Sequence, residues 1–394
     1  MKRLNILDGF RGYFLVFMML NHVALRGGVW LVHVNHGELG YVQDAQGFVF
    51  LSGLMVGMIY SRRMVKDGFW HGAAKMWRRA LEIYRYTLAC LIGIVALAAL
   101  FPDIQSAWRD WLLQLGDQDP LFAVAAVLLL FQPTFMDILP QYIIYMLVAP
   151  PLVWLCIQGR WRIVLAGSIA VWLLIQFGVH LPFIELFHAA AGRIESPGLF
   201  QIYFNLFAWQ ICFMSGLVLG SLTVTGQIDW TRFMDPQRPA LAWAAFGVFL
   251  VFAVIRLGLT FGIYPGSVVG IMNMVDRRDE LSFIYVGNFA ADTYLIAWTL
   301  IAGPRTGNAA LASIAAALRW LFNQPFLRFI GRHSLQTYTL HVFLVYGIRA
   351  LDINYGPWTQ GTKTAVVLGA IAALALPALY RESRFFTRKP ASST

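Results

Sequence analysis

Long apolar runs recur along almost the whole of this 394-residue chain. Each run has about 20 residues, the length that an α-helix needs to cross a hydrocarbon core of roughly 30 Å. The polar intervals between them are too short for a separate soluble domain. We therefore predict an all-α polytopic integral membrane protein with about ten transmembrane helices, forming one domain over residues 1–394. The predicted spans are 10–32, 45–61, 81–100, 137–157, 161–179, 204–222, 240–258, 283–302, 334–351 and 364–380.

The composition agrees with a membrane location. Hydrophobic residues make up 59% of the chain and charged residues only 13%, about half of their share in soluble domains. The net charge of +10 does not predict a nucleic-acid partner, because topology accounts for most basic residues of a membrane protein. The three cysteines stand alone within apolar runs, without the paired spacing of zinc or redox sites. We predict buried free thiols, no metal site, and membrane lipid as a partner.

Basic residues are distributed unevenly across the predicted spans. If the N-terminus is cytoplasmic, 21 of the 30 lysines and arginines lie in inside segments, which predicts that both termini are cytoplasmic. Residues 381–394 then form a short cytoplasmic tail. Residues 62–80 mix basic and aromatic side chains, as an amphipathic helix on an anionic inner leaflet does. A count of eleven spans is the alternative, and it would place the C-terminus outside.

Ionisable residues inside spans are energetically costly, so each is a candidate for function. The first span region carries Asp8, Arg11, Asn21 and His22. Arg11 and His22 are eleven residues apart, about three turns and roughly 16 Å of rise, so they share one face near opposite leaflets. Asp8 and Arg11 are three residues apart and can pair at the inner end. The structural alternatives are an ion pair that fixes topology and a histidine that serves packing.

Two other regions add polar side chains. In the ninth span Ser334 and His341 lie seven residues apart on nearly one face, with His341 near mid-membrane, and interhelical hydrogen bonding is the structural alternative. The outer end of the fourth span and the sixth span hold amide, carboxyl and aromatic groups suited to sugar hydroxyls and sugar faces. These residues are Asp137, Tyr142, Asn205, Trp209 and Gln210. An interfacial aromatic belt would also account for the aromatic ones.

Other local patterns indicate packing or exclude enzyme classes. Ser52, Gly53 and Gly57 in the second span form a small-xxx-small pattern, which predicts a close helix–helix contact. The chain has no GxSxG, HExxH or GxxxxGK[ST] motif. These absences argue against a serine hydrolase, a zinc protease of that type and a P-loop ATPase.

An ordered set of motifs gives this sequence a resemblance to a known family. The set comprises LDGFRG with the Arg11–His22 spacing, then FVFLSGLMVG, DILPQY, NLFAWQ and GRHSLQTYTLH. Over nearly the whole chain the sequence resembles the OpgC proteins of the transmembrane acyltransferase superfamily. The resemblance implies helices around a polar cavity in the bacterial inner membrane. It also implies O-acylation, with succinyl-CoA or acetyl-CoA as cytoplasmic co-substrate and a periplasmic glucan or related saccharide as acceptor, and no permanently bound cofactor.

The family pattern falls most directly on Arg11 and His22, and less directly on His341, Ser334, Asp137 and Asn205. On this basis we expect His22 to take the proton of a sugar hydroxyl that attacks the thioester. Asn21, Gln210 or Tyr142 would then donate to the developing oxyanion. An acyl-histidine intermediate on His22 or His341 is the two-step alternative.

Basic residues are expected to hold the donor. The CoA phosphates would bind near Arg11 and the basic segment, for which the predicted ligands are Arg62, Arg63, Arg78 and Arg79. Arg26, placed one turn beyond His22 on the same predicted helix, would bind a succinyl carboxylate. The competing interpretation is a transporter or flippase that moves an acyl or glycan substrate without making a bond, since intramembrane Arg, His and Asp also mark transport paths.

Overall fold

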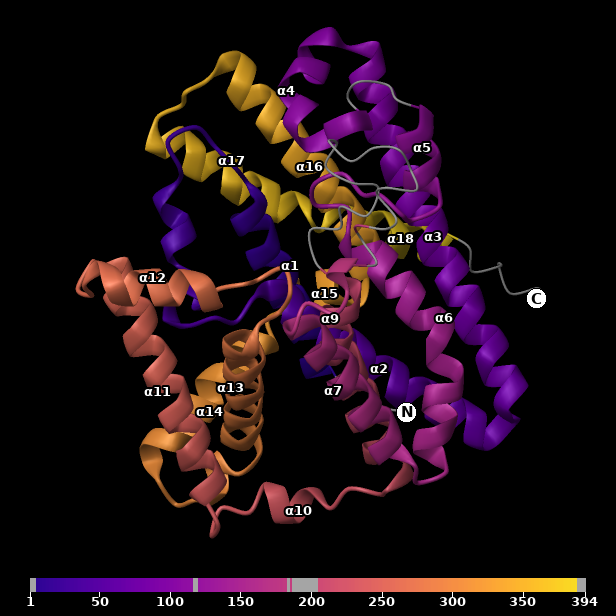
Figure 1. The fold of residues 1–394 in the computed structure, drawn as a ribbon, viewed down its shortest axis with the longest axis vertical. Coiled ribbons are helices and arrows are strands. Elements are labelled where there is room, and N and C mark those ends of the chain that lie inside the picture. The colour runs from indigo at the N-terminus through magenta and orange to yellow at the C-terminus, as the bar shows by residue number, and fades with distance from the viewer. Residues whose placement is uncertain (1–4, 116–119, 183–184, 186–204, 388–394) are drawn as a thin grey trace. The chain divides into compact units, whose positions relative to one another are not determined.

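All regular secondary structure is helical in the part of the chain that the computed structural model describes, namely residues 5–115, 120–182, 185 and 205–387 (Figure 1). The predicted all-α class is confirmed for this part. The first α-helices are α1 (Asn5–His22), α2 (Asp44–Asp67), α3 (Phe69–Leu100), α4 (Pro102–Leu112), α5 (Pro120–Val127), α6 (Ile138–Ile157), α7 (Trp161–Gln176) and α9 (Leu206–Thr225). They are followed by α10 (Trp230–Phe233), α11 (Ala240–Thr260), α12 (Gly266–Val275), α13 (Phe283–Ile301), α14 (Ala309–Phe322), α15 (Pro325–Arg332), α16 (Ser334–Tyr355), α17 (Gln360–Ala373) and α18 (Leu376–Thr387). The 3₁₀ turns are η1 (Trp30–His33), η2 (His36–Leu39), η3 (Leu113–Leu115) and η4 (Gly303–Arg305).

Six helical stretches within the described residues are long and apolar enough to cross a membrane, as expected of a multi-pass membrane protein. They are Asp44–Asp67, Phe69–Leu100, Ile138–Ile157, Leu206–Thr225, Ala240–Thr260 and Gln360–Ser383. Three shorter apolar helices, α7, α12 and α14, accompany them. The ten-span count and the cytoplasmic placement of both termini stay predictions.

The first predicted span, residues 10–32, is wrong at its C-terminal end. Helix α1 ends at His22, and a non-helical segment follows. Gly27 and Gly28 adopt positive φ angles of 73° and 65°, which right-handed helices do not contain. Arg26 therefore lies in a loop beyond α1 and not on the same helix as His22.

The predicted amphipathic segment 62–80 is divided between two helices. Gly68, with a φ of 84°, separates the end of α2 from the start of α3. Within α3, Ala73, Met76, Ala80 and Ile83 are buried at helical spacing, so one face of this basic stretch packs inward. Of the predicted tail 381–394, residues 381–387 belong to α18, and residues 388–394 lie outside the described residues.

The chain forms two compact units. Unit 1 comprises Met1–Val34, Tyr86–Asp110 and Leu318–Thr394, and unit 2 comprises Asn35–Arg85 and Trp111–Ala317. Helices α3, α4 and α14 contribute to both units.

Unit 1 is organised by close packing of α1 on α15. A Cβ added at Gly9 would overlap the carbonyl oxygen of Phe322, and one at Gly12 would overlap that of Leu327. In return, a Cβ at Gly331 would overlap the carbonyl of Asp8. Only glycine permits backbones to approach this closely, so these positions fix how α1 lies against α15.

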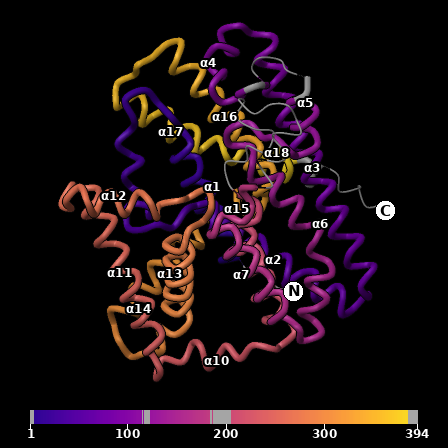
Figure 2. Tube along the Cα trace, in the orientation of Figure 1, coloured from indigo at the N-terminus to yellow at the C-terminus, as the bar shows by residue number. Residues whose placement is uncertain are grey.

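Unit 2 contains a second contact of the same type, between α2 and α9. Gly53 and Gly57 lie against the carbonyls of Phe213 and Leu217, while Gly216 and Gly220 on α9 lie against carbonyls of α2. The hydroxyl groups of Ser61 and Ser221 hydrogen-bond at 2.9 Å farther along the pair. The small-xxx-small prediction for the second span is confirmed. Beside this pair, α11 and α13 pack on one another (Figure 2).

Candidate active site

Two histidines from distant parts of the sequence meet in unit 1. His22 is the last residue of α1 and is half-buried, whereas His341 lies two turns into α16 and is 0% exposed. Nδ1 of His22 lies 3.1 Å from Nε2 of His341, and the ring centroids are 5.0 Å apart. A hydrogen bond at this distance needs a proton on one nitrogen and a lone pair on the other. The two imidazoles therefore form a pair that can share and relay a proton.

The loop after His22 is held by buried charged side chains. Asp352 on α16 is 1% exposed and accepts the backbone N–H of Arg26 at 2.7 Å. The same carboxylate lies 3.6 Å from Nε of Arg26, whose side chain is 45% exposed. Lys363 on α17 is also buried and donates to the carbonyls of Arg26 and Gly28 at 2.7 and 2.9 Å. These bonds anchor the chain directly after the candidate base.

The remaining predicted residues of unit 1 lie on the same helices. Asp8 is 3% exposed near the start of α1, and Arg11 is half-buried one turn later. Asn21 is exposed next to His22, and Ser334 is 4% exposed as the first residue of α16. The structure thus places six of the predicted positions, together with Arg26, in one unit on α1, its following loop and α16. The Asp8–Arg11 pairing stays a prediction.

The residues predicted to bind sugar on the sixth span have internal partners in unit 2. The Asn205 side chain caps α9 by accepting the N–H groups of Phe207 and Ala208. Trp209 is 0% exposed, and its Nε1 donates to the carbonyl of Asp279 at 3.0 Å.

Gln210, the neighbour of Trp209, exchanges two bonds with Ser168 on α7, both of 2.7 Å. Helix capping and interhelical bonding thus account for the polar groups of these three residues. Their role in saccharide binding stays a prediction.

Asp137 and Tyr142 lie on or beside α6, also in unit 2. Asp137 is the N-cap residue of α6 and is 4% exposed. Tyr142 is half-buried and packs its ring against Phe213 of α9 at a centroid distance of 5.6 Å. The structure brings this pair to the same helix cluster as Trp209 and Gln210.

The basic residues predicted to bind the donor line the end of α2 and the start of α3. Arg62 and Arg78 are exposed and make no hydrogen bond or ion pair within the described residues. Arg63 lies over the ring of Tyr60, 5.6 Å from its centroid. Arg79 pairs with Glu82 at 2.7 Å. At least two guanidinium groups are thus available to an anion.

Asp352 and Lys363 are two further site residues that were not predicted from the sequence. Both are ionisable residues within or beside predicted spans, which is the same signal that singled out His22 and His341. The signal that distinguishes them is structural, because each is nine-tenths or more buried and bonded to the loop after α1.

Comparison with known proteins gives a match to a protein family. The family model described as OpgC protein matches residues 2–384. The curated proteins and the solved structures give no significant match. Because the matched region spans nearly the whole chain, this protein belongs to the OpgC protein family.

Proposed function

We propose that this protein is a membrane-bound O-acyltransferase. It moves an acyl group, succinyl in the simplest case, from cytoplasmic acyl-CoA to a hydroxyl group of a periplasmic saccharide such as an osmoregulated glucan. The OpgC family is associated with succinyltransferase activity on periplasmic glucans. The observation that carries the proposal in this chain is the 3.1 Å contact between His22 and His341, since O-acyl transfer needs a group that removes a hydroxyl proton.

The geometry suits His22 as the base and His341 as its partner. We assign a proton to Nδ1 of His22, which donates to Nε2 of His341, so that Nε2 of His22 carries the lone pair. The acceptor hydroxyl gives its proton to that nitrogen while its oxygen forms a bond to the thioester carbonyl carbon. The carbon–sulfur bond then breaks, and the proton on Nε2 passes to the leaving thiolate, which departs as CoA. His341 stabilises the transient imidazolium by accepting its Nδ1–H.

The basic side chains supply the donor contacts in this proposal. Arg62 and Arg78 of unit 2 bind phosphate groups of CoA together with Arg63 and Arg79 of the same unit. Arg26 binds the distal carboxylate of a succinyl donor. Its guanidinium is already oriented by Asp352 but remains 45% exposed, so a second carboxylate has access to it.

A transporter is the second candidate, because buried ionisable residues also line substrate paths. The buried Asp352 and Lys363 favour it in principle. Their hydrogen bonds, however, are to the loop after α1, where they hold the backbone in place. Transport without bond formation would release no CoA.

Thiol release in proteoliposomes tests the proposal. Protein reconstituted with succinyl-CoA or acetyl-CoA is assayed with and without periplasmic glucan, comparing wild type with His22→Ala. Glucan-dependent CoA release that His22→Ala abolishes is the expected result. Binding of glucan or CoA by folded protein, without CoA release from either donor, would contradict the acyltransferase assignment and favour transport.

A further inference from the structure

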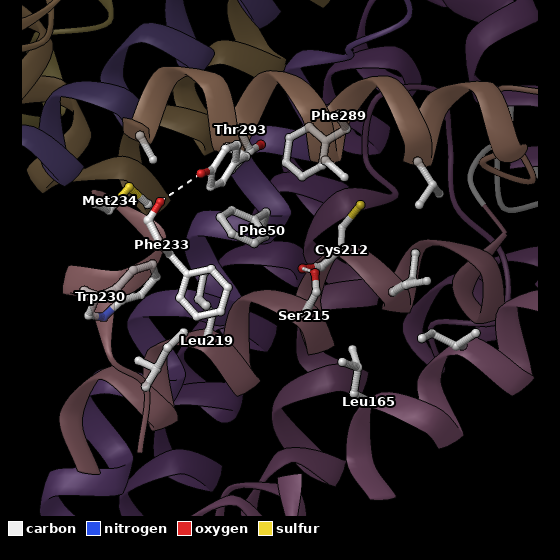
Figure 3. Close-up of a pocket in the computed structure, with 17 residues that line it drawn as sticks. Phe50, Leu165, Cys212, Ser215, Leu219, Trp230, Phe233, Met234, Phe289 and Thr293 are labelled. Atoms are coloured by element: carbon white, nitrogen blue, oxygen red, sulfur yellow. Dashed lines mark hydrogen bonds between the residues drawn. The ribbon is translucent and has the colours of Figure 1, made fainter. Parts of the chain in front are cut away.

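An apolar cavity of about 410 Å³ lies within unit 2, between α7, α9 and α13 (Figure 3). Ile211, Cys212, Ser215 and Leu219 form its wall on α9, which is one of the candidate membrane spans. The opposite wall is α13, and α10 contributes at one end. Because the α9 residues belong to the middle of that helix, the cavity lies at the depth of the hydrocarbon core.

The lining selects an apolar occupant. It contains no charged side chain. The hydroxyl of Ser215 already donates to the carbonyl of Cys212, and that of Tyr294 donates to the carbonyl of Phe233, the bond drawn in Figure 3. A polar ligand would therefore lose its hydrogen bonds to water and gain few in return, whereas a hydrocarbon chain would lose none.

The cavity has the length of one membrane leaflet. Its α13 wall extends from Val286 to Ala297, and the eleven steps between these residues rise by roughly 16 Å along the helix. This rise is close to half of the hydrocarbon thickness of about 30 Å. A single acyl chain of one leaflet would run along α13 over this distance.

A basic side chain stands at the α10 end of the cavity. Arg232 lies between Trp230 and Phe233, two residues that line the cavity, and it is exposed. The backbone N–H of Arg232 bonds to the carboxylate of Asp229, three residues earlier, and that carboxylate also interacts with the charge of Arg232. Within the described residues the Arg232 guanidinium nevertheless forms no ion pair, unlike that of Arg238 on the same connection, which lies 3.7 Å from Asp235. A lipid whose apolar chain lies in the cavity would place an anionic headgroup close to this positive charge.

From the apolar lining, the leaflet length and the cation at one end, we infer that unit 2 binds one membrane glycerophospholipid. One acyl chain occupies the cavity along α13, and the phosphate contacts Arg232. This inference is independent of the acyl-transfer proposal, because it uses none of the residues assigned there.

Photolabelling of the full chain tests the site. The protein is reconstituted in vesicles of phosphatidylethanolamine and phosphatidylglycerol containing a trace of phosphatidylglycerol with a diazirine in one acyl chain. After illumination, labelled peptides are mapped by mass spectrometry. We expect label on the lining segments of α9 and α13. Label spread evenly over the exposed apolar helices would overturn the proposal.

Two variant pairs sharpen the result. Ala290→Trp fills the cavity from α13, while Gly287→Trp places the same side chain on that helix where an added Cβ meets nothing within 4 Å. Ala290→Trp should lose the cavity label and Gly287→Trp should keep it. Arg232→Gln should reduce labelling by the lipid, and Arg238→Gln should not.

Two further outcomes would each contradict part of the inference. Equal labelling in Ala290→Trp and Gly287→Trp would show that the cavity holds no chain. Equal labelling in both arginine variants, together with equal labelling by a diazirine fatty acid, would show that no phosphate is recognised. If Ala290→Trp fails to fold by size-exclusion chromatography, Ala297→Leu fills the same wall with a smaller side chain, and the same loss of label is expected.

Discussion

Replacing His341 by phenylalanine tests the assignment of this residue as the partner of His22. Phenylalanine keeps the ring in the buried position and removes the nitrogen that lies 3.1 Å from His22. Before reaction the bond joins two neutral rings and contributes about 1 kcal/mol net. In the transition state His22 carries a proton, so the bond becomes charge-assisted and contributes about 1.5–3 kcal/mol.

The difference between these two states sets the expected loss. About 0.5–2 kcal/mol of stabilisation exists only in the transition state, so kcat should fall by roughly 2- to 30-fold in His341→Phe. The KM for acyl-CoA should change little. By contrast, His22→Ala removes the base itself, and a loss of about 10²- to 10⁴-fold is expected.

Steady-state CoA release in proteoliposomes, with the acyl-CoA concentration varied, gives both constants. His341→Gln is a partial rescue, because its amide oxygen can accept from His22 Nδ1. His71→Phe, which alters a histidine that is 53% exposed on α3, is the matched control and should be silent. If kcat fell by more than about 10³-fold in His341→Phe, and an acyl group could be trapped on His341 in the wild type, His341 would be the nucleophile of a two-step transfer and not the partner of His22. No change in kcat would refute the pairing.

Three further changes give measurable effects on stability in detergent. Asp352→Ala should lower the free energy of unfolding by about 2–3 kcal/mol, because it leaves the N–H of Arg26 without its buried acceptor. Asp352→Asn should lower the free energy of unfolding by less, and thermal denaturation of the two variants measures the difference. Gly57→Ala should cost about 1–3 kcal/mol or prevent folding, because the new Cβ overlaps the carbonyl of Leu217, as size-exclusion chromatography and melting temperature would reveal. Burial lowers the pKa of His36 from 6.5 to about 4, so its contribution to stability is complete above pH 6.5 and is lost as the pH falls towards 4. The wild-type melting temperature should therefore fall more steeply over this window than that of His36→Gln, and parallel profiles would contradict the reasoning.

Local patterns in the sequence correctly indicated features that are set by residues a few positions apart on one helix. The spacing of Gly53 and Gly57 predicted a close helix contact, and the structure has it. The polar faces of the first and ninth spans singled out His22 and His341. The sequence did not show that these two would meet, because 319 positions separate them.

The predictions that were wrong or remain untested concern residues whose partners are distant in the sequence. Helix α1 does not continue to residue 32, because the N–H of Arg26 bonds to Asp352 and Gly27 and Gly28 have positive φ angles, and a hydropathy pattern registers neither. Trp209 and Gln210 looked available for sugar, yet Asp279 and Ser168 engage their polar atoms. Likewise, the bonds of Asp352 and Lys363 to the loop after α1 become visible only once α16 and α17 are placed.

The glycine contacts of α1 with α15 and of α2 with α9 restrict how this chain can change. At each contact the atom that faces the glycine is a backbone carbonyl oxygen. Every amino acid carries that atom, so no substitution on the opposite helix can make room for a methyl group. Alanine, serine and cysteine all introduce the same Cβ and meet the same obstacle. We expect these positions to tolerate glycine alone in a saturation mutagenesis scan, and second-site suppressors to lie at helix ends, where a whole helix can shift.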